Sequence, residues 1–96
     1  MKTVSELLYG VKMVGRQVKL QQIEGAEVSV QSVGNFATDF AAGAAVQCMQ
    51  DGEDLWFLTF ASVVIETLET LSGQEPYLAK FMSHTSGTGR TYWTVE

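Results

Sequence analysis

The 96-residue chain has one cysteine and one histidine, and these low counts exclude several common kinds of site. Cys48 has no second cysteine with which to form an internal disulfide, so a disulfide-stapled scaffold is excluded. His84 has no second histidine for a zinc site, and the chain has neither a P-loop nor a Gly-x-Gly-x-x-Gly sequence. We therefore expect a protein that is not an enzyme and that has no metal or other cofactor.

Long hydrophobic runs are also missing. No apolar run approaches the roughly 20 residues of a membrane-spanning helix, and the first residues lack the pattern of a secretory signal peptide. We expect a cytoplasmic protein without membrane contact. The length and the 46% hydrophobic content fit one compact domain over residues 1–96.

Positive charge is scarce and confined to the two ends of the chain. Six basic residues stand against eleven acidic ones, which gives a net charge of −5, and nothing between Leu20 and Ala79 is basic. A surface that meets an anionic partner must therefore combine residues from both ends. The basic residues are Lys2, Lys12, Arg16, Lys19, Lys80 and Arg90.

The clearest pattern of secondary structure lies in residues 44–73. An apolar run over 44–50 is followed by a turn built on Asp51-Gly52, and residues 55–61 are rich in aromatic and branched side chains. Apolar residues at helical spacing then predict a helix over 62–71, with Ser62 as its cap and Gly73 as its stop. This segment is predicted to be a hairpin that runs directly into a helix.

The residues before this segment predict a helix and a strand. Thr3 and Glu6 have the form of a capping box, which begins a short amphipathic helix over 4–13. Residues 16–33 alternate as one long strand that bends at Gly25, and a separate hairpin at Glu24-Gly25 is the competing interpretation.

Two further segments complete the chain. Residues 35–43 form a loop that contains Phe36 and Phe40, which either fold back over the core or contact a ligand. Residues 77–83 and 90–95 alternate around a turn rich in glycine, serine and threonine, which predicts a second hairpin.

The order of these elements predicts a mainly β protein with two short helices. Five strands with a helix between the third and the fourth is the order of the OB-fold, a Greek-key barrel, here with an extra N-terminal helix. The residues that share the inward-facing side of each predicted strand or helix form the predicted core. They are Val18, Leu20, Trp56, Leu58, Val64, Leu68, Tyr77, Phe81, Trp93 and Val95.

Three stretches of sequence carry a resemblance to a family. VGRQVKLQQIE near the start, LWFLTFASVVIETLETL in the middle, and EPYLAKF with RTYWTV at the end resemble small OB-fold proteins of phages and prophages that are similar to single-stranded DNA-binding proteins. The resemblance covers residues 14–95. It implies single-stranded DNA as partner and a role in phage replication or recombination.

Binding of a single strand requires aromatic faces for the bases and cations for the phosphates. The two loops and the outward faces of an OB-fold present such groups, although each aromatic residue here has core packing as its alternative role. The candidate binding residues are Phe36, Phe40, Phe57, Tyr92, Lys19, Lys80, Arg90 and His84.

Two functions from different classes follow from the sequence. The aromatic residues favour a single-stranded nucleic-acid-binding domain, whose few cations a homo-oligomer would pool. The net negative charge favours the alternative, an acidic OB-fold module that binds a protein partner, such as a phage-encoded inhibitor or a replisome adaptor. Exposed aromatic side chains beside Lys80 and Arg90 would support the first, and burial of those aromatic side chains under an acidic face the second.

Overall fold

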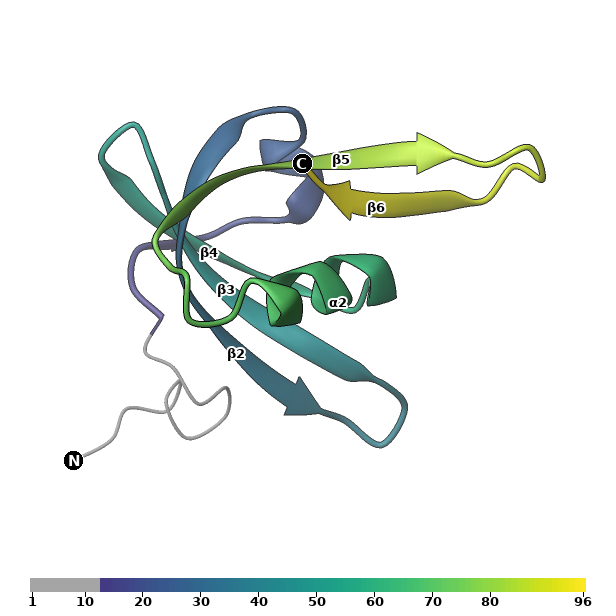
Figure 1. Ribbon diagram of the computed structural model, residues 1–96, viewed down its shortest axis with the longest axis horizontal. Coiled ribbons are helices and arrows are strands. Elements are labelled where there is room, and N and C mark those ends of the chain that lie inside the picture. The colour runs from purple at the N-terminus through teal and green to yellow at the C-terminus, as the bar shows by residue number, and fades with distance from the viewer. Residues whose placement is uncertain (1–12) are drawn as a thin grey trace.

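The computed structural model describes residues 13–96 as a β-sheet with one α-helix and one 3-10 helix (Figure 1). The helix expected over 4–13 falls on residues outside this range. The elements in chain order are β1 (Arg16–Gln17), the 3-10 helix η1 (Leu20–Ile23), β2 (Glu27–Ala37), β3 (Ala42–Gln50), β4 (Glu53–Thr59), α2 (Ser62–Thr70), β5 (Tyr77–Thr85) and β6 (Thr91–Val95).

The six strands form one open sheet in the order β1-β4-β3-β2-β5-β6. β2 to β6 pair through antiparallel ladders, whereas β1 pairs with β4 in parallel over two residues. A mainly β fold with a helix between the central hairpin and the last hairpin is therefore confirmed. The closed barrel is not, because in the described chain β1 and β6 form the two edges and do not pair.

The single bent strand expected over residues 16–33 is wrong. The chain instead forms β1, η1 and β2, because Lys19 and Gln22 close a tight turn between them. The N–H of Lys19 donates to Gln22 Oε1 at 2.7 Å, and the N–H of Gln22 donates to the Lys19 carbonyl at 2.9 Å. Leu20 and Ile23, three residues apart, are buried on one side of this turn.

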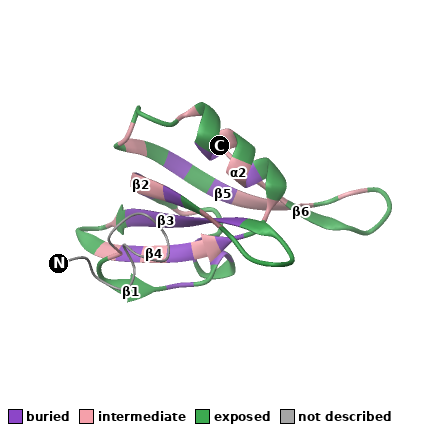
Figure 2. Cartoon of the chain, turned by 90° about the horizontal axis from the view of Figure 1, so that it is seen from below, coloured by how far each residue is buried: buried purple, intermediate pink, exposed green. Residues whose placement is uncertain are grey.

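The facing of β4 is also opposite to the prediction. Leu55 and Phe57 point into the core, where Phe57 meets Phe81 edge to face at 5.1 Å, whereas Trp56 and Leu58 are only half-buried on the other face. Tyr77, Trp93 and Val95 lie partly buried at the core's margin. The predicted core residues that are buried are Val18, Leu20, Val64, Leu68 and Phe81. Figure 2 shows how burial concentrates on β3 and β4.

The helix α2 follows β4 as predicted and packs Val64 and Leu68 against the sheet. Its cap residue is Ala61 rather than Ser62, and the Ala61 N–H donates to Thr59 Oγ1 at 3.2 Å. No helix in residues 13–96 is long and apolar enough to cross a bilayer.

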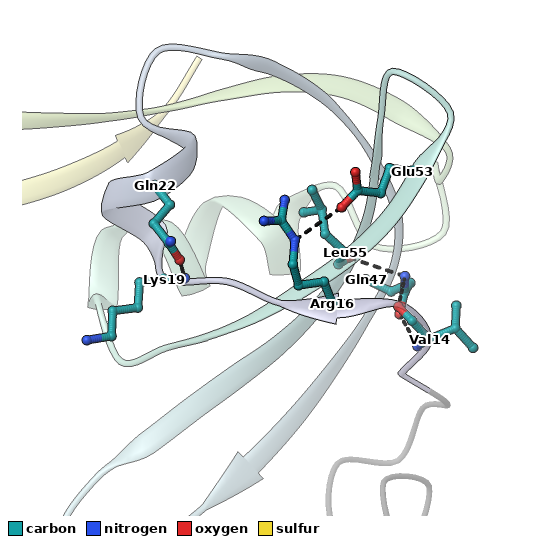
Figure 3. A network of polar contacts seen from close by, with 7 residues as sticks. All are labelled: Val14, Arg16, Lys19, Gln22, Gln47, Glu53 and Leu55. Atoms are coloured by element: carbon teal, nitrogen blue, oxygen red, sulfur yellow. Dashed lines mark hydrogen bonds and ion pairs between the residues drawn. The ribbon is translucent and has the colours of Figure 1, made fainter.

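A buried glutamine holds the start of the described chain against the sheet (Figure 3). Gln47 Oε1 accepts from the N–H of Val14 at 2.7 Å, while Gln47 Nε2 donates to the carbonyls of Val14 at 2.9 Å and Leu55 at 3.2 Å. Arg16 of β1 also forms an exposed ion pair with Glu53 at 3.1 Å. These contacts place β1, and the turn that follows it, beside β4.

Candidate functional site

Two phenylalanines, Phe36 half-buried and Phe60 exposed, form a pair where β2 and β4 end. The rings of Phe36 and Phe60 meet edge to face with centroids 5.5 Å apart, and Phe60 is 52% exposed. Gly43 lies opposite Phe36 in the β2–β3 ladder, and a Cβ there would lie 2.6 Å from Phe36 Cζ and 3.0 Å from Phe60 Cε1. The absence of a side chain at Gly43 therefore gives the two rings the space to meet.

Phe60 also borders a hollow of about 320 Å³ that lies between the β1–η1 segment, the end of β4 and β6. Lys19 is its charged residue, and none of the lining residues is acidic. Phe60 thus belongs both to the Phe36–Phe60 pair and to the lining of a hollow without negative charge. The lining residues are Gln17, Val18, Lys19, Leu20, Gln21, Leu58, Thr59, Phe60, Ala61 and Trp93.

Lys19 is available to an anion. Its backbone is fixed at the start of η1, while its side chain extends away from the ribbon into solvent (Figure 3). None of the ion pairs within residues 13–96 involves Lys19.

The β5–β6 hairpin supplies a second aromatic surface. His84 and Tyr92 stack across the two strands with ring centroids 5.2 Å apart, and Tyr92 is 45% exposed. His84 Nε2 also lies 2.9 Å from Thr94 Oγ1. A second hollow of about 200 Å³ lies between Tyr92, Trp93 and the first turn of α2. Trp93 lines both hollows and so connects this surface to Phe60.

The other predicted binding residues lie apart from this surface. Phe57 is fully buried and cannot stack on a base. Lys80 is exposed opposite Glu27 on the β2–β5 ladder, and it lines neither of the two hollows. Arg90 is exposed beside the tip of the β5–β6 hairpin, which extends beyond the body of the molecule (Figure 1).

Phe40 is the most exposed large hydrophobic side chain among the described residues, at 97%. The loop that carries it is held by Thr38, whose Oγ1 accepts from the N–H groups of Phe40 at 3.2 Å and Ala41 at 3.1 Å. Of the two alternatives left open by the sequence, the ring therefore does not fold back over the core.

Sequence reasoning missed Phe60 and Trp93 as site residues, because Phe60 was not among the candidates and Trp93 was assigned to the core. For Phe60, which directly follows β4, the two-residue turn at Asp51-Gly52 was the available signal, since it fixes the pairing of Gln50 with Glu53 and hence the facing of β4. No such signal existed for Trp93.

Other chemistry is limited in this part of the chain. Cys48 is buried, and burial raises the pKa of its thiol to about 12, so the thiol stays protonated near neutral pH. Within residues 13–96, no three His, Cys, Asp or Glu side chains converge to hold a metal ion.

A scan against protein-family models, a search of the curated proteins and a search of the solved structures each found no match to this chain. Its function is therefore inferred from the geometry of the site.

Proposed function

We propose that the chain is a single-stranded nucleic-acid-binding domain built on a partly open, OB-like sheet. The observation that supports this most is a hollow that is lined by two aromatic side chains, Phe60 and Trp93, and that contains Lys19 and no carboxylate. Phe36 meets Phe60 edge to face, and Tyr92 lies at the second hollow, which Trp93 also lines. We call this surface the aromatic band, and its members are Phe36, Phe60, Trp93 and Tyr92.

The OB-like assignment rests on the order of the elements and on their pairing. The helix α2 lies between β4 and β5, and β2 pairs with both β3 and β5, so the strands connect as in a Greek key. β1 pairs with only two residues of β4, so the rest of β4 and β6 face an opening in the sheet. The first hollow lies at that opening.

The physical basis of binding is stacking supported by a few cations. A base that stacks on an aromatic side chain contributes about 1–3 kcal/mol and does so for any sequence. The aromatic band offers several such rings, and Lys19 can neutralise a phosphate between them. Recognition of a single strand without sequence preference is the function that this combination supports.

The acidic residues limit the affinity. The net charge is −5, although the carboxylates of the Asp51–Glu53 turn and of α2 lie outside both hollows that border the band. Each neutralised phosphate of a single strand contributes about −0.7 to the slope of log K against log salt. We therefore expect weak binding with a shallow salt dependence.

Fluorescence anisotropy with labelled oligo-dT across a salt series tests the proposal. Phe60→Ala should weaken binding about 5- to 150-fold, the equivalent of one lost stacking contact. Leu78→Ala is the matched control, because Leu78 is 66% exposed on β5 and lines neither hollow. It should bind like the wild type. If the wild type does not bind at low salt and high micromolar concentration, the acidic protein-binding module becomes the better account.

A further inference from the structure

The opening between β4 and β6 is the feature from which a more specific ligand can be inferred. β1 follows β4 only as far as the pairing of Gln17 with Trp56, and the last contact between them is the Val18 N–H to the Trp56 carbonyl at 2.9 Å. Beyond this point, no strand within residues 13–96 pairs with that side of β4. The hollow of about 320 Å³ occupies the place of the missing strand.

Backbone groups border this hollow beyond the last hydrogen bond between β1 and β4. The Trp56 carbonyl faces β1, and since backbone groups alternate along a strand, the N–H and C=O of Leu58 face the same side, where the hollow lies. On the other wall, Glu96 and Lys80 exchange both backbone hydrogen bonds, so the same alternation turns the backbone groups of Trp93 away from β5. The hollow therefore offers donors and acceptors as well as aromatic rings.

The size and the charge restrict the ligand further. A volume of about 320 Å³ lies at the lower end of the range of about 300–1,000 Å³ for small-molecule sites, which suits one flat ring system rather than two. Its single charged side chain is Lys19, a cation that lies beside the aromatic walls.

We propose that the hollow takes one unpaired nucleobase of a bound strand, with its ring against Trp93, its polar edge toward the Leu58 backbone and its phosphate at Lys19. This inference rests on the proposed function and adds a defined position for one nucleotide. A paired base cannot enter, because its polar edge is already occupied by its partner, so the hollow also favours single strands over duplexes.

Tryptophan emission tests this position, because the chain has two tryptophans, Trp56 and Trp93. Trp56→Phe leaves Trp93 as the reporter in the hollow, and Trp93→Phe leaves Trp56 as the matched control. Oligo-dT should quench the emission of the first variant and leave that of the second unchanged, each measured at an oligo-dT concentration at which anisotropy shows that the variant is bound. If Trp56→Phe does not fold, the comparison of wild type with Trp93→Phe gives the same information.

An oligonucleotide of equal length with abasic sites separates the base from the phosphate. It retains the backbone charge, so we expect binding at least about 5-fold weaker than that of oligo-dT and no quenching. Equal quenching by the abasic strand would overturn the proposal, because the backbone would then occupy the hollow. Oligo-dT binding in anisotropy with unchanged Trp93 emission would overturn the position while leaving the proposed function intact. Absence of any binding would overturn both.

Discussion

Gly15 has a backbone position that leaves little room for a side chain. Its φ of +85° lies in the left-handed region, and a Cβ there would overlap the Asp54 carbonyl oxygen and lie 2.7 Å from Asp54 Cβ. Gly15→Ala should therefore strain the turn by about 1–3 kcal/mol and, in addition, push β1 away from β4. The measurement is the free energy of unfolding in urea.

Gly52→Ala provides the control for this prediction. Gly52 also has a positive φ, +78°, but a Cβ there would meet nothing within 4 Å, so this variant has the backbone strain without the overlap. Equal losses of stability in the two variants would show that the contact of Gly15 with β4 is unimportant.

The facing of individual residues was the least predictable feature at this scale. In the run LWFLTF both faces of β4 carry large apolar side chains, so alternation of polarity could not show that Phe57 points inward and Phe60 outward. The exposure of Phe40 and Tyr92 was predictable because they lie in or beside turns. The exposure of Phe60 and the position of Trp93 between the core and the hollow were not, because they depend on the register of the sheet.

At the scale of elements, a carboxylate joins the end of η1 to β5. Glu24 Oε2 accepts from the hydroxyl of Ser83 and from the Ser83 N–H at 3.1 Å. The hydrogen bond from the Ser83 hydroxyl has the larger effect and that from the Ser83 N–H the smaller, and together they hold the pKa of Glu24 below its ordinary value. The nearby His84 lowers this pKa further.

The lowered pKa of Glu24 predicts a dependence of stability on pH. A carboxylate whose pKa is depressed in the folded state stabilises the fold above its ordinary pKa, and this contribution is lost as the pH falls through the folded value. Urea unfolding should therefore show wild type more stable than Glu24→Gln near neutral pH, with the difference narrowing as the solution is acidified. The matched control is Glu66→Gln, in an exposed position on α2. A difference between wild type and Glu24→Gln that does not change with pH would contradict this role of the ionised carboxylate.

The elements themselves were largely predictable. The central hairpin and α2 follow from the Asp51-Gly52 turn and from helical spacing, which are local signals. The long strand over residues 16–33 was wrong because η1 depends on a hydrogen bond from the Lys19 N–H to the Gln22 side chain. Alternation of polar and apolar residues does not reveal such a hydrogen bond.

At the scale of the whole molecule, the openness of the sheet could not be predicted from the sequence. The order of helix and strands is the same in an open sheet and in a closed barrel, and the difference lies in pairing between segments far apart in the chain. Here β1 occupies part of the β4 edge, and β6 remains at the opposite edge of the sheet. The hollow at this opening, and the aromatic band beside it, are consequences of that arrangement.

The measurement that tests the aromatic band most directly is a ¹H–¹⁵N NMR titration of the full chain with oligo-dT at low salt. The account predicts that chemical shift changes concentrate on the amides of Lys19 and Phe60 and on the Trp93 indole, while the amides of Gly52 and Glu66 remain unchanged. No shift changes at high micromolar concentration, or changes confined to the acidic turn and α2, would contradict the account.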